Sequence, residues 1–268
     1  MRVHVVQHVP FEGPALIAEW AAARGHELTA SLALREEYPP AEQIEFLCVM
    51  GGPMSADDEV ASPWLRAEKH FIASVIAAGL PVLGVCLGAQ ILAEVIGGTV
   101  RRNESPEIGW FPVERTPIGA SEPLFASWSD STTVGHWHED TFQLPVGMEP
   151  SLSSAACPNQ AFVFDQRVVG LQFHIEWTEE SLQTLITECG GDLAVWHPSV
   201  MTPERMLRGA HFEVPTCRDR LFTLLDDLTL ATSASLDPVA SPEADGAGPV
   251  RDLEPATFAW SGLAGSTS

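Results

Sequence analysis

The chain has 268 residues, of which 45% are hydrophobic, and this length is enough for one large α/β domain. Its 36 acidic and 14 basic side chains give a formal net charge of −22, and a field of that sign repels phosphate backbones, which excludes a nucleic-acid-binding protein. The sequence has no apolar run of about 18 residues, no signal-like amino terminus and no Cys-x-x-Cys pair among its five scattered cysteines. We therefore expect a cytoplasmic protein that has reduced thiols and no membrane partner.

The first third of the chain alternates short apolar runs with helical patterns. We expect strands over 3–6, 28–34, 46–50 and 82–85, and helices over 14–24, 62–78 and 87–96. Short apolar strands joined by helices predict an α/β fold, with an open, mostly parallel sheet between helices on both faces, in three layers. Ligands of such sheets bind beyond the carboxyl ends of the strands. Gly51-Gly52 and Cys86 each follow a strand, so we expect them to share one crevice.

The rest of the domain has a different texture. Short strands are expected over 99–102, 110–116, 132–137, 151–156, 161–164 and 168–173, which together predict a small antiparallel β addition, with a hairpin turn at Gln166-Arg167. Helices are expected over 178–188, 203–209 and 218–230. From residue 231 the composition is rich in Ser, Ala, Pro, Gly and Asp, which predicts a disordered tail. The expected organisation is therefore one domain, 1–230, and a tail, 231–268.

One stretch has the pattern of a nucleophile elbow. Residues 82–85 form a short apolar run, Cys86 follows, and Gly84 and Gly88 flank the cysteine at minus two and plus two. A tight strand-to-helix turn forces the nucleophile into a strained conformation, and small neighbours prevent backbone clashes. The thiol would lie at a helix N-terminus, which favours the thiolate, and the Leu87 N–H would point outward. The alternative is a small buried hydrophobe, the role that we expect for the other four cysteines.

A cysteine nucleophile needs a base and a group that orients the base. His174 and Glu176 lie two residues apart at the end of the strand expected over 168–173. Their side chains share one face if the strand extends through them, so the carboxylate can hold one ring nitrogen while the other faces the thiol. The alternative is an unrelated surface pair, and the position at a strand end favours the functional interpretation.

Three separated motifs together resemble the class I (triad) glutamine amidotransferase family. They are Gly51-Gly52-Pro53, the stretch from Gly84 to Gln90, and His174-Ile175-Glu176, in this order. The chain is most similar to the stand-alone proteins that resemble the glutaminase domain of GMP synthetase. The resemblance implies a flavodoxin-like open sheet, in agreement with the pattern above. The stretch Glu107-Ile108-Gly109-Trp110 also resembles the stand-alone proteins, but we assign it no chemical role.

The resemblance implies a role for each matching residue. Cys86 would attack the glutamine side-chain amide and form a γ-glutamyl thioester, His174 would shuttle protons, and Glu176 would orient His174. The N–H groups of Gly52 and Leu87 would form the oxyanion hole. Substrate contacts would come from Gln90, in the helix after the elbow, and from His138 and Asp140. These two residues lie in the segment 136–140, which matches the family's Ser-His-Gly-Asp loop. This route needs no metal and no organic cofactor.

The sequence departs from the family pattern in two places. Ile175 stands where the family usually has proline, which affects only local stiffness because Glu176 is kept. In the substrate loop, Trp137 and Glu139 replace the usual serine and glycine, and these bulky residues suggest a different γ-glutamyl substrate. His136 and His138 alternate along a strand, but no cysteine or carboxylate lies at a ligand spacing from them, so we expect no metal.

Three functions are compatible with these residues. The first is a glutamine amidotransferase that hydrolyses glutamine and releases ammonia to an unknown acceptor, which a separate synthetase chain would supply because this chain is too short to contain one. The second is a γ-glutamyl peptidase that acts on glutathione-like conjugates. The third is a non-catalytic regulatory or binding subunit, which the complete triad argues against.

Overall fold

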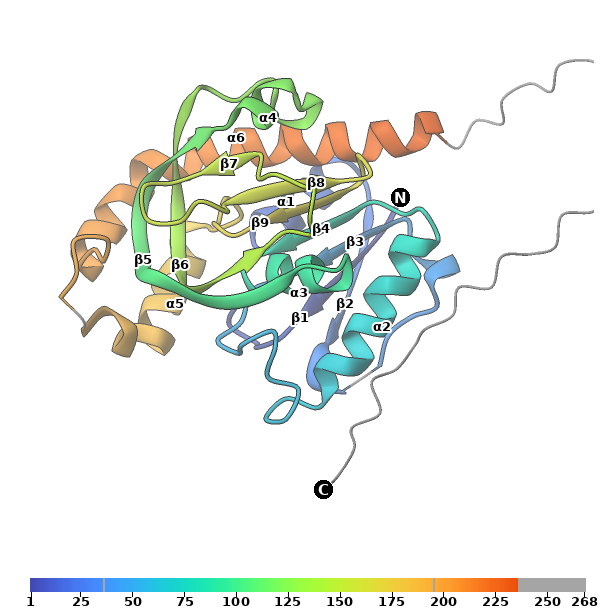
Figure 1. Cartoon of the computed structure of the whole chain (residues 1–268), viewed down its shortest axis with the longest axis horizontal. Helices are drawn as coiled ribbons and strands as arrows, with labels where there is room; N and C mark the ends of the chain where they lie inside the picture. The colour runs from blue at the N-terminus through green and yellow to red at the C-terminus, as the bar shows by residue number, and fades with distance from the viewer. Residues whose placement is uncertain (36, 195, 236–268) are drawn as a thin grey trace, which may run out of the picture. The chain divides into compact units, whose positions relative to one another are not determined.

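The computed structural model describes residues 1–35, 37–194 and 196–235 (Figure 1). Within these residues nine strands form one sheet in the order β2-β1-β3-β4-β9-β8-β7-β5-β6. The strands are β1 Arg2–Gln7, β2 Glu27–Leu32, β3 Phe46–Val49, β4 Val82–Val85, β5 Thr99–Arg115, β6 Ser131–Gln143, β7 Leu152–Ser153, β8 Ala161–Phe164 and β9 Val168–Leu171. The α-helices are α1 Leu16–Ala23, α2 Trp64–Ala77, α3 Leu87–Val95, α4 Pro117–Ser121, α5 Glu179–Cys189 and α6 Pro203–Ser235.

The half of the sheet from β2 to β9 is parallel, and helices cover both of its faces. In β3, Phe46 and Cys48 join the apolar cluster that includes α1 and α6, whereas Leu47 and Val49 join the cluster that includes α2 and α3. In Figure 1, α2 and α3 lie in front of the sheet and α1 and α6 behind it. Because strand side chains alternate between faces, both sets of side chains are buried. This confirms the predicted three-layer, flavodoxin-like fold.

The antiparallel part is larger than predicted. The strands expected over 99–102 and 110–116 are one continuous strand, β5, which pairs with β6 and has a register irregularity between Arg102 and Glu107. The bulge lets one strand pass through a segment that contains Pro106, where a regular ladder would be interrupted. The predicted hairpin is confirmed, with Asp165 and Gln166 at φ of 50° and 56° between β8 and β9.

The prediction of separate helices over 203–209 and 218–230 is wrong. They form one helix, α6, with Pro215 in its interior, because buried side chains on both sides of the proline, such as Ala210 and Cys217, hold the helix on the sheet. The predicted domain boundary at residue 230 falls inside α6, and the rest of the predicted tail, 236–268, lies outside the described residues. Neither α6 nor any other helix in the described part of the chain has the length and apolar character to cross a bilayer.

Candidate functional site

The elbow lies between β4 and α3. Cys86 has φ of 52° and ψ of −109°, a strained conformation for a residue with a side chain. A Cβ on Gly88 would lie 2.1 Å from the Val49 oxygen, and a Cβ on Gly84 would lie 2.7 Å from the Gly88 carbonyl atoms. Both flanking glycines are therefore required by close backbone approach, which is the physical reason for the spacing in the sequence.

Two of the backbone amides around the thiol are engaged in hydrogen bonds. The Cys86 N–H donates to the Leu171 oxygen at 2.7 Å, and the Gly88 N–H donates to the Met50 oxygen at 3.1 Å. Leu87 between them is the first residue of α3, where an N–H has no intrahelical acceptor. A Cβ on Gly52 would lie 3.0 Å from the Leu87 side chain. The two predicted oxyanion-hole residues are thus neighbours.

His174 and Glu176 are in contact, although not in the way that the strand pattern predicts. β9 ends at Leu171, and His174 is held instead by an isolated bridge to Gly135 in β6, with N–H···O distances of 2.7 and 3.0 Å. His174 Nδ1 lies 2.6 Å from Glu176 Oε1, and both side chains are buried. An ionised carboxylate can accept hydrogen bonds but cannot donate them. The Nδ1–H of His174 is therefore the donor, and Nε2 remains for another partner.

The Cys86 side chain lies beside the ring. A Cβ on Gly51 would lie 3.5 Å from His174 Cε1 and 3.6 Å from Cys86 Cβ, so the two side chains meet at this loop. Burial alone would lower the pKa of His174, but the charge and hydrogen bond of Glu176, together with the neighbouring Cys86 side chain, raise this pKa well above its usual range. The arrangement favours an imidazolium beside the sulfur.

Trp177 fixes the plane of the His174 ring. The two rings are stacked, with centroids 4.3 Å apart and an interplanar angle of 15°, a geometry that also stabilises a charged imidazole. A Cβ on Gly135 would lie 2.4 Å from the indole. Glycine at that position therefore lets the indole reach the imidazole.

Cys86 opens into a cavity of about 290 Å³, at the lower end of the range for ligand sites. Its lining combines the elbow, the Gly51-Gly52 loop, β6 and α5. The lining contains four acidic residues, Glu12, Glu139, Asp140 and Asp192, and one basic residue, Arg102. The predicted substrate residues Gln90, His138 and Asp140 also line this cavity, so the structure brings all eight predicted site residues into one region.

Gln172 is a site residue that the sequence patterns did not reveal. Its amide nitrogen lies 3.8 Å from Cys86 Sγ, and its amide oxygen accepts from Gln90 Nε2 at 3.2 Å. The Cys86 thiol also donates to the Trp137 carbonyl at 3.6 Å. Gln90 is thus linked to the sulfur through Gln172 as well as facing the cavity.

The two unusual residues of the substrate loop have partners in the protein. Trp137 Nε1 donates to Asp192 Oδ2 at 2.9 Å, and Glu139 is paired with Arg102. Asp140 accepts from Ser55 Oγ at 2.8 Å while facing the cavity. The two bulky residues therefore form part of the cavity wall, and each is anchored to a charged side chain.

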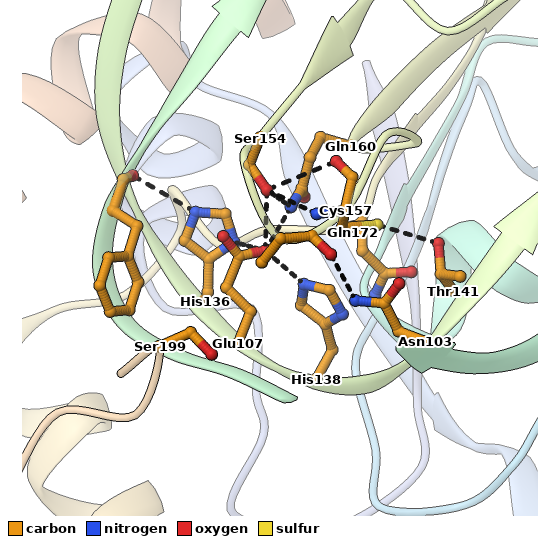
Figure 2. A network of polar contacts seen from close by, with 12 residues as sticks. Asn103, Glu107, His136, His138, Thr141, Ser154, Cys157, Gln160, Gln172 and Ser199 are labelled. Atoms are coloured by element: carbon orange, nitrogen blue, oxygen red, sulfur yellow. Dashed lines mark hydrogen bonds and ion pairs between the residues drawn. The ribbon is translucent and has the colours of Figure 1, made fainter. Parts of the chain in front are cut away.

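His138 is less available to a ligand than predicted. Its Nδ1 lies 3.0 Å from the Asp140 oxygen, and its Nε2 lies 3.2 Å from Glu107 Oε2. Figure 2 shows Glu107 between His136 and His138, with Ser154 and Gln160 beside it. Burial lowers the pKa of His136 to about 4. Glu107, to which the sequence patterns assign no role, is therefore the centre of a buried polar network behind the cavity.

Two further residues lie next to the Gly51-Gly52 loop. His8 is fully buried between the Gly51 oxygen, 3.0 Å from Nδ1, and Glu68 Oε1, 3.0 Å from Nε2. Burial lowers the pKa of His8, but the Glu68 charge and hydrogen bond raise it above its usual range. Glu12 faces the cavity, and burial raises its pKa. Neither residue belongs to a recognisable motif, because both follow β1, far in sequence from Cys86.

Comparisons with known proteins agree with this geometry. The family model "Glutamine amidotransferase class-I" matches residues 17–189. The chain is 34% identical over 239 residues to the glutamine amidotransferase-like protein YfeJ of Salmonella typhimurium, covering 87% of this chain and 99% of that protein. It is 30% identical to a subunit of the glutamine-hydrolyzing GMP synthase of Saccharolobus solfataricus, over 58% of this chain and 82% of the relative. A Thermotoga maritima glutamine amidotransferase structure matches with a TM-score of 0.78 and 29% identity, over 85% and 98% of the two chains.

Proposed function

The chain belongs to the class I glutamine amidotransferase family, and from this premise we propose that it hydrolyses the side-chain amide of glutamine through Cys86, His174 and Glu176. One observation carries the proposal. A strained cysteine that lines a cavity lies beside a histidine whose Nδ1 is held 2.6 Å from a carboxylate. These are the nucleophile, base and orienting group that covalent amide hydrolysis needs.

In the proposed first half-reaction, the Cys86 thiolate attacks the amide carbon. The tetrahedral oxyanion forms next to the N–H groups of Gly52 and Leu87. His174, as the imidazolium, gives its Nε2 proton to the departing nitrogen, so the C–N bond breaks and ammonia leaves. The product is a γ-glutamyl thioester on Cys86.

In the second half-reaction, neutral His174 takes a proton from water, which attacks the thioester carbon. The C–S bond breaks, glutamate leaves, and the thiolate–imidazolium pair is restored. The carboxylate of Glu176 stabilises the imidazolium each time it forms. No step requires a group other than the substrate, water and these side chains.

The charge of the cavity favours glutamine over glutathione-like conjugates. The group that leaves glutamine is ammonia, which carries no carboxylate. The α-ammonium group of glutamine suits a wall that contains Glu12 and Asp140. A glutathione-like leaving group brings an additional carboxylate into a lining that has four acidic side chains and only Arg102, which is already paired with Glu139. Like charges there disfavour the peptidase alternative.

The proposed acceptor of the ammonia is a separate chain. One relative is by name a subunit of a glutamine-hydrolyzing GMP synthase, and glutaminase activity in such a protein is useful when a second chain uses the ammonia. In the same way, a second chain would use the ammonia that is released at Cys86.

The experiment is a coupled assay of glutamate and ammonia. We expect equal release of both from glutamine, a lower kcat/KM for γ-glutamyl dipeptides, and no release by Cys86→Ala. Addition of a co-purifying protein, if one is found, tests whether a partner raises the rate. Hydrolysis of γ-glutamyl dipeptides in strong preference to glutamine would restore the peptidase alternative.

A testable consequence concerns His8, which we infer to be a positioning residue for the oxyanion hole. Its Nδ1 faces the Gly51 oxygen, which belongs to the same peptide group as the Gly52 N–H. A protonated His8 polarises that peptide, and so strengthens the N–H as a donor. Glu68→Gln removes the charge that keeps the pKa of His8 high. We expect kcat to fall roughly threefold to tenfold, less than the loss of a whole oxyanion-hole donor, with little change in KM.

The pH profile separates this role from a merely structural one. In the Glu68→Gln variant, the lower pKa of His8 should make kcat fall as the pH rises through that pKa, whereas the native protein keeps His8 protonated over the same range. The control is Glu179→Gln, which removes the carboxylate from an exposed pair with His211. A uniform loss at every pH in Glu68→Gln would indicate only local disorder and would reject the positioning role.

A further inference from the structure

Glu107, His136 and His138 form a buried cluster outside the proposed triad. Glu107 pairs with His138 across the β5–β6 ladder, and His136 lies two residues away on the same face of β6. The exposed fractions are 2% for Glu107, 0% for His136 and 5% for His138. The antiparallel register thus supplies the carboxylate that the sequence around the two histidines lacks.

The outer nitrogen of each ring is fixed by a backbone carbonyl. His136 Nε2 lies 3.3 Å from the Phe111 oxygen, and His138 Nδ1 lies 3.0 Å from the Asp140 oxygen. A carbonyl accepts hydrogen bonds and cannot donate, so these outer nitrogens carry the hydrogens. In neutral rings the inner nitrogens, His136 Nδ1 and His138 Nε2, then hold lone pairs. Figure 2 shows both rings turned toward Glu107.

These lone pairs converge on one carboxylate oxygen. His138 Nε2 is 3.2 Å and His136 Nδ1 is 3.4 Å from Glu107 Oε2. Among the described residues, His136 Nδ1 has no hydrogen-bond partner, since the 3.4 Å contact lacks hydrogen-bond geometry. The Glu107 oxygen already accepts from Gln160 Nε2 at 2.6 Å and from Ser154 Oγ at 3.1 Å. Facing lone pairs repel one another unless a positive charge lies between them.

The pair formed by His8 and Glu68 is an internal comparison. There one carboxylate faces one imidazole, and a single proton makes the pair neutral overall. At Glu107 one carboxylate faces two imidazoles, so one extra proton would leave the second lone pair unmatched. A divalent cation satisfies all three groups at once.

We propose that Glu107, His136 and His138 bind one divalent transition-metal cation of the zinc class. Bonds of 2.0–2.1 Å to a tetrahedral zinc ion place two ligand atoms about 3.4 Å apart, close to the 3.2 and 3.4 Å separations here. All three ligand atoms lie within 4.8 Å of one another. The carbonyl contacts of the outer nitrogens are the supporting contacts that metal-bound imidazoles normally make.

Ser154 can make room for the cation on Glu107. Its hydroxyl also reaches the Cys157 oxygen at 3.4 Å, so a rotation of this hydroxyl frees one lone pair of Glu107 Oε2. Gln160 keeps its hydrogen bond and continues to orient the carboxylate.

The consequence of binding is a rigid β6 next to the thiol. Trp137 lies between the two histidines, and its carbonyl accepts from Cys86 Sγ, while His138 lines the cavity. A cation that ties β6 to β5 would hold this wall in place. The metal site does not rest on the proposed glutaminase function, because its test measures bound metal.

The test is metal content in a background without the Cys86 thiol, which could itself bind zinc beside His174. Full-length Cys86→Ala protein is incubated with Zn²⁺ or Co²⁺, dialysed and measured by elemental analysis. We expect one metal ion per chain, absent from the double variants with Glu107→Gln or His136→Gln and retained in the control with His211→Ala, an exposed histidine beside Glu179. The Co²⁺ form should show d–d bands without thiolate charge transfer.

Melting temperature is the second measurement. Zn²⁺ should raise the melting temperature of Cys86→Ala, and leave that of a folded Glu107→Gln double variant unchanged. Absence of bound metal from Cys86→Ala, or full retention by the Glu107→Gln variant, would overturn the proposal. If the double variants do not fold, the stoichiometry and the cobalt spectrum of Cys86→Ala still decide, because thiolate bands or no binding would reject these ligands.

Discussion

Replacement of Cys86 by serine should lower the glutaminase kcat on the order of 10³-fold or more. The substitution is nearly isosteric, so the elbow and the contacts to Gln172 and Trp137 can remain. What changes is the nucleophile, since sulfur attacks an amide carbon far more readily than an unactivated hydroxyl does. The backbone at φ of 52° tolerates serine as well as cysteine, so folding should be unaffected.

The measurement is single-turnover release of ammonia, with the melting temperature as a check of folding. A glutamine-mimicking electrophile gives a second readout, because it should label the native protein and fail to label Cys86→Ala. Cys48 is the matched control, since it is a fully buried cysteine on β3, and Cys48→Ala should keep both labelling and activity. Labelling that survives in Cys86→Ala would show that another thiol reacts, and an inert native protein would favour a regulatory role instead.

Replacement of His174 by alanine should lower kcat by about 10³-fold, because it removes both proton transfers. Glu176→Gln should have a smaller effect, about 10²-fold, if Glu176 acts only through the orientation and charge of His174. The 2.6 Å contact to Nδ1 is the basis of this order. Equal and mild losses for both variants would leave the triad without support.

The pH profile shows whether Glu176 acts through His174. The Glu176 charge and hydrogen bond raise the pKa of His174, and the first half-reaction needs the imidazolium. Activity is therefore lost as the pH rises through the pKa of His174. In Glu176→Gln this pKa falls, so the basic limb of the kcat/KM profile should move to lower pH. A basic limb that stays in place while kcat falls would mean that Glu176 acts in another way.

The order of the relevant elements could be predicted from the sequence because the signals are local. An apolar run, a cysteine and glycines at plus and minus two fix the elbow, since close backbone contacts at Gly84 and Gly88 leave no room for a side chain. The parallel half of the sheet follows from short apolar strands that are buried on both faces. Where long-range packing decides, the predictions were less accurate, as in α6, which continues through Pro215 because its apolar side chains are buried on both sides of it.

Sequence by itself determined the residue types of the proposed chemistry and the strand end that Cys86 follows. Tertiary structure alone decided that Gln172 meets the thiol, that His8 lies behind Gly51, and that Glu107 faces two histidines. The physical reason is sequence separation. Contacts between residues on different strands depend on register, and the register of β5 against β6 changes at an irregularity between Arg102 and Glu107, so the partner of His138 follows from the paired strands and not from either strand alone.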